Sequence, residues 1–334
     1  MDANLTTSSN NCQISMINKP TKKVIQQAAE LLHEGKLVAF PTETVYGLGA
    51  AATNPAAVKQ IFSVKGRPRN HPVIVHLADV KQLEQWARVI PPFAWRLAQQ
   101  FWPGPLTLLL PKAAGVSDAI TGQQDTVGLR IPAHPIAQAL LKAFGEGIAA
   151  PSANRFGQIS PTLAEHVQQE LGSRVDLILD GGPCSCGIES TILDCSGEQP
   201  RILRPGIITA SQLSAVVGTL AINITPDAPR VSGALASHYA PQTPLQIVAA
   251  PFVAAPPDAI VLAMHPPAHL SPSLQWLQMP TDPLAYAHDL YAALRFADAQ
   301  GCSLILVEEI PAGEEWDAIR DRLQKAAAEK PENS

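Results

Sequence analysis

Two short polar clusters, far apart in a chain poor in charge, carry residue types that bind phosphate. The first is Lys65-Gly66-Arg67-Pro68-Arg69, in which cations alternate. In an extended segment, alternate side chains point to the same side, so these three cations would add their fields on one anion. The second is Pro151-Ser152-Ala153-Asn154, which follows the apolar run 148–150 and offers a hydroxyl and an amide at positions i and i+2. Together they predict a phosphate-binding pocket.

With further motifs, these clusters resemble the YrdC-like threonylcarbamoyl-AMP synthases. The match starts near residue 20 and reaches about residue 215, and its motifs follow the family order: Phe40-Pro-Thr-Glu-Thr-Val-Tyr-Gly-Leu-Gly49, Lys65-x-Arg67, Pro103-Gly-Pro-Leu-Thr107, Arg130-Ile-Pro132, Pro151-Ser-Ala-Asn154 and Glu189-Ser-Thr191. In weaker form, Ser232-Gly233 and His238-Tyr-Ala-Pro241 resemble the linker of the longer version of this enzyme. That version has two domains, a YrdC-like domain and a C-terminal α/β domain.

The resemblance implies a reaction that joins L-threonine, bicarbonate and ATP into threonylcarbamoyl-AMP and pyrophosphate, for threonylcarbamoyl-adenosine modification of tRNA. It implies Mg²⁺ with ATP, and downstream tRNA threonylcarbamoyl-transfer proteins as partners. An N-carboxylated threonine must bring a carbamate oxygen against an α-phosphate that is already negative, so like charges have to be neutralised first. The sequence contains neither a GxSxG elbow nor a GxxxxGK[ST] loop, so neither a serine hydrolase nor a P-loop enzyme is indicated.

Lys65 and Arg67 are the expected catalytic residues and the expected ligands of the triphosphate. Arg offers a planar fork to two phosphate oxygens and Lys a compact charge; a solvated basic loop is the alternative, and Arg69 fits a surface role equally well. Ser152 and Asn154 would reach the phosphates or a bound magnesium without adding charge. The resemblance also implies that the ATP site contains Thr126, Ser160, Arg204, His238 and Tyr239. The last two belong to a linker that folds over the nucleotide cavity in the family, and a hinge packed between domains is their alternative role.

Arg130 is the expected partner of the threonine carboxylate, because it interrupts the apolar strand 127–131 and a buried Arg demands an anion. An internal pair with Glu189 or Asp180 remains the alternative. The resemblance adds Thr42, the backbone of Ala150, Ser190 and His76 to the amino-acid pocket, although a lone His in a strand is often a core residue. Glu43 could act as a base or as a structural carboxylate. No metal ligand is predicted among the side chains.

The elements that must position these residues alternate between strands and helices, which predicts an open, twisted, mixed α/β sheet for a YrdC-like domain at 18–218. An amphipathic helix is expected at 21–34, closed by Gly35, and Asn54-Pro55 should start another. Strands are expected at 37–40, 73–77, 106–110, 127–131, 147–150, 175–179, 191–194 and 201–203, and helices near 92–101, 135–144, 162–171 and 209–217.

The rest of the chain divides into three further parts. Residues 1–17 are expected to form a flexible arm, and the proline-containing segment 219–244 a linker or lid. A smaller, doubly wound, Rossmann-like domain is expected at 245–334, with strands near 245–250, 259–264 and 303–309 and helices at 283–299 and 315–329.

Composition sets limits on the partners. The 334 residues are 46% hydrophobic and 16% charged, with a net charge of −5. Residues 1–215 contain 18 Lys and Arg against 16 Asp and Glu, whereas residues 231–334 contain 5 against 12. An anionic substrate therefore belongs with the first part, and the acidic second part suits nucleic acid poorly. No apolar run is long enough to span a bilayer and the five cysteines show no zinc spacing, so a cytoplasmic protein is expected.

Two alternative functions differ from this hypothesis. An RNA-binding module would use the basic cavity for structured RNA, but the first part lacks the interleaved aromatic residues of such surfaces and has a charge near zero. Carbamoyl transfer of the hydrogenase-maturation kind uses a related domain. Those proteins carry zinc-finger CxxC pairs, and this sequence has none.

Overall fold

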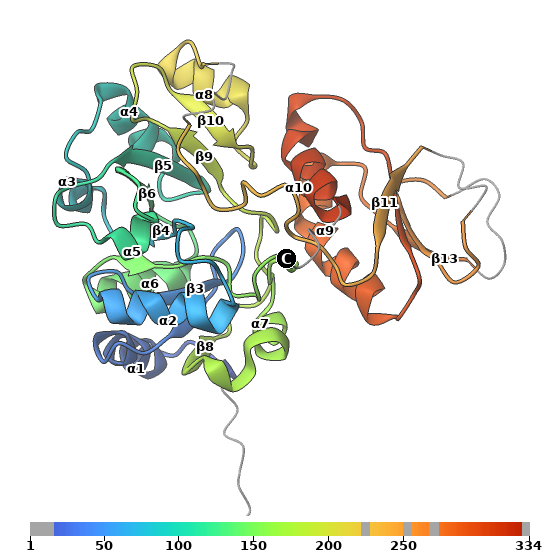
Figure 1. Ribbon diagram of the computed structural model, residues 1–334, viewed down its shortest axis with the longest axis horizontal. Coiled ribbons are helices and arrows are strands. Elements are labelled where there is room, and N and C mark those ends of the chain that lie inside the picture. Colours follow the sequence, from blue (N-terminus) through green and yellow to red (C-terminus); the bar gives the residue numbers. More distant parts are fainter. Residues whose placement is uncertain (1–16, 222–227, 250–254, 267–273, 329–334) are drawn as a thin grey trace, which may run out of the picture.

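The computed structural model describes residues 17–221, 228–249, 255–266 and 274–328, which form a larger and a smaller α/β unit (Figure 1). The larger unit contains a ten-stranded mixed sheet with the order β1-β8-β2-β3-β7-β4-β6-β5-β9-β10. The smaller unit contains a four-stranded parallel sheet with the order β11-β14-β12-β13. The predicted fold class, a large mixed sheet followed by a smaller α/β domain, is confirmed.

The strands of the large sheet are short, and most are buried on both faces, which explains their continuous apolar runs. They are β1 (Ile17–Asn18), β2 (Val38–Phe40), β3 (Gly47–Ala51), β4 (Ile74–His76), β5 (Leu106–Pro111), β6 (Thr126–Arg130), β7 (Ile148–Ala149), β8 (Leu177–Leu179), β9 (Thr191–Asp194) and β10 (Arg201–Arg204). Sequence patterns do not predict β3, because two glycines interrupt it. The structure needs Gly49 there: a Cβ would lie 2.9 Å from both Phe40 and Ile148.

The helices described in the large unit are α1 (Lys22–His33), α2 (Pro55–Lys65), α3 (Leu83–Trp86), α4 (Pro92–Phe101), α5 (Asp118–Thr121), α6 (Pro135–Phe144), α7 (Ala164–Leu171) and α8 (Ala210–Val217). Five of these eight, α1, α2, α5, α6 and α8, begin after a residue whose side chain caps a backbone N–H group. The Asn54 side chain accepts hydrogen bonds from the first backbone N–H groups of α2, as predicted. The predicted helices and strands of both units lie within two residues of their expected bounds.

The expected alternation of Lys65, Arg67 and Arg69 along an extended segment is wrong. Lys65 is the last residue of α2, and Gly66 follows in the left-handed region with φ of 63°. This αL cap turns the chain, so that Lys65 and Arg67 are buried while Arg69 stays exposed at the surface. The i, i+2 spacing therefore does not place the three cations on one side.

The smaller unit packs its helices against the larger one. Its elements are β11 (Leu245–Val248), β12 (Ile260–Ala263), β13 (Gln275–Gln278), α9 (Pro283–Ala299), β14 (Ile305–Glu308) and α10 (Asp317–Ala327). Both α9 and α10 lie between the small sheet and the large unit (Figure 1). Val45, Ile159 and Ile188 of the large unit share one buried apolar cluster with residues of α9 and α10. The two units therefore share a core.

Three sequence predictions concern segments that the structure describes partly or not at all. The expected flexible arm lies outside the described residues, apart from Ile17 in β1. Residues 228–244 of the expected linker run between the two units, and the expected domain boundaries stay predictions. Within the described ranges, no helix is both long and apolar enough to cross a membrane.

Candidate functional site

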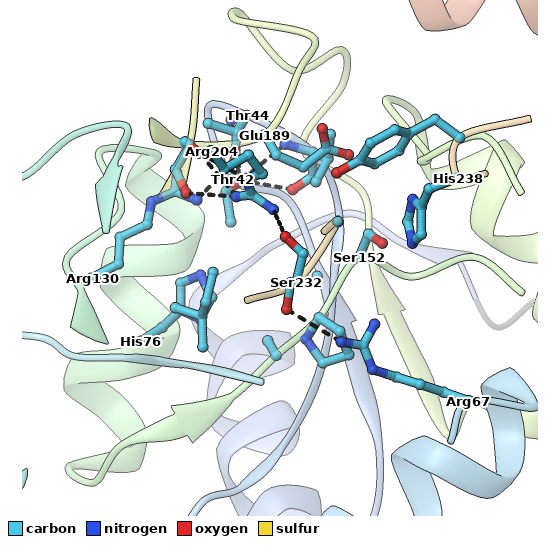
Figure 2. Close-up of a pocket in the computed structure, with 18 residues that line it drawn as sticks. Thr42, Thr44, Arg67, His76, Arg130, Ser152, Glu189, Arg204, Ser232 and His238 are labelled. Carbon is cyan, nitrogen blue, oxygen red and sulfur yellow. Dashed lines mark hydrogen bonds between the residues drawn. The ribbon is translucent and has the colours of Figure 1, made fainter. Parts of the chain in front are cut away.

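A cavity opens where the large unit meets the linker. Its walls come from the loop after β2, the segment after α2, strands β4 and β6, the segments after β7 and before β9, the end of β10, and the linker (Figure 2). It brings together ten of the residues that the sequence predicts for the site: Thr42, Arg67, His76, Arg130, Ala150, Ser152, Ser190, Arg204, His238 and Tyr239.

Three buried arginines face this cavity from different elements. Arg67, Arg130 and Arg204 are 6%, 4% and 3% exposed. Arg67 donates to the Pro72 carbonyl at 2.9 Å and Arg204 to the Ser190 carbonyl at 2.9 Å, but in the described part of the chain neither has a salt bridge. Burial lowers the pKa of Arg67 to about 10. Two buried guanidinium groups without a carboxylate form a site that favours an anion.

Ser232 of the linker connects two of these arginines. Its carbonyl accepts a hydrogen bond from Arg204 at 3.0 Å, and its hydroxyl accepts one from Arg67 at 3.3 Å (Figure 2). The Ser232 hydroxyl also lies 3.0 Å from the Pro72 carbonyl, to which it donates. Sequence reasoning identified the Ser232-Gly233 motif but assigned it no ligand role, because a serine in a linker has no distinguishing local signal.

Arg130 is neutralised by a carboxylate that the sequence does not single out as its partner. Arg130 Nη2 lies 2.8 Å from Glu43 Oε1, and Nη1 donates to Thr44 Oγ1 at 2.9 Å. The alternative pairs with Asp180 and Glu189 are wrong, because Asp180 binds Lys19 and Glu189 binds Arg322. Since Glu43 Oε2 also accepts the Ala133 N–H at 3.0 Å, Glu43 is a fully engaged structural carboxylate.

Thr42 organises the loop that carries Glu43. Its Oγ1 donates to the Val45 carbonyl at 2.6 Å and accepts from the backbone N–H of Thr44 at 3.1 Å. Ser190 shares a hydrogen bond of 2.8 Å with Thr107 and accepts one from Arg204. Both predicted hydroxyl residues are therefore in the wall, and both already have protein partners.

Four predicted residues are not among those that line the cavity: Lys65, Thr126, Asn154 and Ser160. Lys65 Nζ donates to the carbonyls of Ser152, at 2.7 Å, and of Asn154. Burial and the nearby charge of Arg67 lower the pKa of Lys65 well below its usual value. Asn154 Nδ2 donates to the carbonyls of Arg155 and Gln158, and Ser160 Oγ donates to Glu189. Thr126 begins β6, buried, with no partner for its hydroxyl among the described residues.

Two histidines in the cavity wall are neutral. Burial, together with the charge of Arg130, lowers the pKa of His76 to about 3. Burial also lowers the pKa of His238 to about 3; the carboxylate of Glu189 opposes this shift, and the charges of Arg67 and Lys65 add to it. Neutral imidazoles can donate or accept hydrogen bonds without adding charge. His76, for which a core role was the alternative, does line the cavity beside Arg130 (Figure 2).

Several polar atoms around this cavity are buried without a partner. Within the described ranges, no hydrogen bond reaches Arg67 Nε, His76 Nδ1, His238 Nδ1 or Tyr239 Oη. An unpaired buried polar group is costly in a folded protein, so a cluster of them around one cavity indicates a polar ligand. No three His, Cys, Asp or Glu side chains of the described chain gather as a metal site.

Comparison with known proteins gives two family matches. Residues 30–206 match the family described as "Telomere recombination", and residues 208–328 match "Threonylcarbamoyl-AMP synthase, C-terminal domain". The chain is 39% identical over 318 residues to the threonylcarbamoyl-AMP synthase of Pyrococcus abyssi, covering 91% of this chain and 94% of that protein. It is 49% identical over 228 residues to the Bacillus subtilis protein of the same name, covering 67% of this chain and 66% of that one.

A solved structure supports this similarity across both units. The crystal structure of P. abyssi Sua5 complexed with L-threonine superposes with a TM-score of 0.82 at 36% identity. The superposition covers 93% of this chain and 96% of that one. The likeness therefore includes the smaller unit and the linker as well as the large sheet.

Proposed function

This chain belongs to the threonylcarbamoyl-AMP synthase family, and we propose that it joins L-threonine, bicarbonate and ATP into threonylcarbamoyl-AMP, with release of pyrophosphate and water. The observation that carries the proposal is the pair Arg67 and Arg204, buried in one cavity with no carboxylate partner in the described chain. A third arginine, Arg130, faces the same cavity. Such an arrangement stabilises negative charge where two anions have to meet.

The nucleotide end is proposed to be the Arg67 and Arg204 side. Their guanidinium groups would hold the triphosphate in place of the carbonyl and hydroxyl oxygens that they now contact. Ser152 lines this side and adds a hydroxyl. The unpartnered Tyr239 Oη and the neutral His238 come from the linker, so linker and wall would close on the same ligand. Thr126 is proposed for the adenosine part.

The amino-acid end is proposed to be the Arg130 side, where Thr42, His76, Ala150 and Ser190 also line the cavity. The threonine carboxylate would take one face of the Arg130 guanidinium, which Glu43 and Thr44 hold in a fixed orientation. Its N-carboxylated amine would then point toward the phosphates. Fixed orientation of both reactants supplies a large part of the rate in such reactions.

The chemical step follows from this placement. A carbamate oxygen attacks the α-phosphorus, a new O–P bond forms, and the bond from the α-phosphorus to the bridging oxygen breaks. The electron pair leaves with pyrophosphate, whose charge Arg67 and Arg204 neutralise. No covalent enzyme intermediate is needed. We assign Lys65 and Asn154 to the support of the 151–154 wall, and Lys65 would gain phosphate contact if its Nζ turned from the carbonyls.

Magnesium, bicarbonate and the downstream tRNA-modifying proteins complete the proposal. Since no metal cluster occurs in the described chain, Mg²⁺ would enter on the phosphate oxygens of ATP, which it prefers, and would neutralise part of their charge. The product is a reactive mixed anhydride, so a partner protein must take it before water does. A cytoplasmic location fits a tRNA-modifying role.

The test is a direct assay of the purified full chain. With threonine, bicarbonate, ATP and Mg²⁺, it should release pyrophosphate and form a new adenylate that mass spectrometry identifies as threonylcarbamoyl-AMP. Omission of threonine should stop the reaction. Pyrophosphate release that does not depend on threonine would contradict the proposal, and tight, steeply salt-dependent binding of tRNA would favour an RNA-binding module instead.

A further inference from the structure

Two buried side chains of the smaller unit, Tyr291 of α9 and Arg322 of α10, contact a residue that lines the cavity. Both donate a hydrogen bond to Glu189, which precedes β9. Glu189 Oε2 accepts from Arg322 Nε at 2.7 Å and from Tyr291 Oη at 2.9 Å. Its other oxygen accepts from Ser160 Oγ at 2.5 Å. Two of these three donors therefore come from the smaller unit, more than 100 residues away in the chain.

Glu189 poses an electrostatic problem for a polyphosphate site. Among the described residues that line the cavity, it is the only carboxylate. A bare negative charge there would repel the phosphates that Arg67 and Arg204 attract. Arg322, whose side chain is fully buried, pairs with Glu189 and removes most of that repulsion. Loss of Arg322 would leave an uncompensated buried carboxylate facing the ligand.

The same two residues also support Tyr239 of the linker. The Arg322 guanidinium lies 5.0 Å from the centre of the Tyr239 ring, within cation–π range. The Tyr291 ring stacks on Tyr239 at 5.9 Å with an interplanar angle of 28°. Tyr239 itself has φ of 60°, which a residue with a Cβ adopts only when its surroundings hold it there. The smaller unit therefore helps to fix the position of a cavity-lining residue.

Other charged and titratable groups also face Glu189 or its partner. Burial alone would raise the pKa of Glu189, but Arg322 and Arg204 lower it to about 2. Asp321 accepts from Arg322 Nη1 at 2.5 Å, and the Pro205 carbonyl accepts from Nη2 at 3.2 Å. The groups around Glu189 are Ser160, Arg204, His238, Tyr239, Tyr291, Asp321 and Arg322. Of these, Arg322 is the cation in direct contact with the carboxylate.

We propose that Arg322 and Tyr291 of the smaller unit are positioning residues for the nucleotide site: they neutralise and orient Glu189 and hold Tyr239, so that the cavity can accept a polyphosphate. This inference rests on the function proposed above. It gives the C-terminal unit an indirect part in ATP binding, because neither residue lines the cavity and both act through Glu189 and Tyr239. Removal of Arg322 should weaken ATP binding and leave threonine binding nearly unchanged.

The experiment compares full-length variants by calorimetric titration with Mg²⁺–ATP and, separately, with threonine. Arg322→Met should raise the dissociation constant of ATP about tenfold or more, with less than a threefold change for threonine. Arg320→Met, on the same helix, is the matched control, because Arg320 pairs with Asp317 at the surface. It should bind ATP as wild type does. Wild-type ATP affinity in Arg322→Met would overturn the proposal.

A pH series separates charge compensation from a general loss of packing. In Arg322→Met, burial should raise the pKa of Glu189, so ATP binding should weaken progressively as the pH rises and Glu189 ionises. The double variant Arg322→Met/Glu189→Gln cannot ionise there, so it should lose this pH dependence and bind ATP more tightly than Arg322→Met at about pH 8. A double variant that binds no better, or a single variant without pH dependence, would contradict the charge role.

Tyr291→Phe keeps the experiment decisive if Arg322→Met fails to fold. This variant preserves the ring that stacks on Tyr239 and deletes only the hydroxyl that binds Glu189. ATP affinity should fall about threefold, since one hydrogen bond to a charged acceptor is lost, and unchanged affinity would argue against the proposal. The wild-type protein separates the two hypotheses: if it forms no threonylcarbamoyl-AMP, the proposed function fails, whereas a failure of these variants alone leaves that function intact.

Discussion

Arg130 and Arg67 line one cavity, but only Arg130 has a carboxylate partner in the part of the chain that the structure describes. Arg130 has its own carboxylate, Glu43, at 2.8 Å, so the amino-acid end is close to neutral before any ligand arrives. Among the described residues, Arg67 donates hydrogen bonds only to a carbonyl and a hydroxyl oxygen, and burial lowers its pKa to about 10. This difference fits the proposed roles, in which Arg130 would orient a ligand with one negative charge and Arg67 would neutralise a ligand with several.

The largest effect is expected from Arg67→Ala. Loss of an uncompensated cation at the phosphate end should lower kcat/KM for ATP by about 100-fold or more, and the KM for threonine should change much less. Pyrophosphate release at varied ATP measures this. Lys65→Ala should also lose most activity, because Lys65 holds the 151–154 wall. Arg69→Ala is the matched control, exposed beside the site, and full activity of Arg67→Ala would remove the phosphate role.

Arg130→Met should give the reverse pattern, with the KM for threonine raised about 30-fold and the KM for ATP affected less. The single variant also leaves Glu43 buried without its partner, which costs about 3 to 5 kcal/mol of stability. Arg130→Met/Glu43→Gln removes both charges and serves as the folding control. If the double variant regained normal threonine affinity, Arg130 would not be the carboxylate ligand.

Gly233→Ala tests how tightly the linker fits over the nucleotide end. A Cβ at this glycine, which has φ of 78°, would lie 2.0 Å from Tyr239 Oη. Displacement of Tyr239 should lower kcat/KM for ATP about tenfold. Gly157→Ala is the matched control, since its φ is 81° and a Cβ there would have no neighbour within 4 Å. That control bears the same backbone strain without the steric clash, so equal losses in the two variants would disprove the Tyr239 explanation.

A last effect, on stability rather than on activity, is expected as the pH falls. His76 and His238 have pKa values of about 3 in the folded state against 6.5 in the unfolded chain. Between these values the unfolded chain binds more protons, so the free energy of unfolding is highest above about pH 6.5 and decreases on acidification. Each histidine contributes up to about 1.4 kcal/mol per pH unit in this window.

Urea unfolding at about pH 7, 6 and 5 measures this slope. Glu189, whose pKa is about 2 when folded and 4.5 when unfolded, adds a further loss below pH 4.5. The double variant His76→Gln/His238→Gln should show a clearly shallower slope between pH 6.5 and 5. An unchanged slope would mean that other groups dominate the proton uptake.

Sequence patterns predicted most elements because their signals are local. The cap at Asn54 and the apolar runs of β5 and β6 each depend on residues a few positions apart, and each element was found at its expected place. β3 was missed because its two glycines mimic a loop. Only the packing of Phe40 and Ile148 against Gly49 shows why this position of the strand needs a residue without a side chain.

For the site, the sequence predicted which residues belong to it better than it predicted how those residues are arranged. The sequence indicated ten residues that line one cavity. Residue type and spacing pointed to Arg67, Arg130 and Ser152, and the family resemblance supplied the others. It could not indicate that Lys65 faces carbonyls or that Gly66 turns the chain away from Arg69. Those outcomes depend on a single φ angle and on a loop almost 90 residues away.

By itself, then, the sequence determined that this protein has a large mixed α/β unit, a smaller acidic unit, and arginines placed where an anion must bind. The tertiary structure alone decided how the charges pair: Glu43 with Arg130, Glu189 with Arg322, and no carboxylate for Arg67 in the described chain. Local patterns arise from residues that are neighbours along the chain. Charge pairing arises from residues that folding brings within 3 Å, and no spacing in the sequence records that distance.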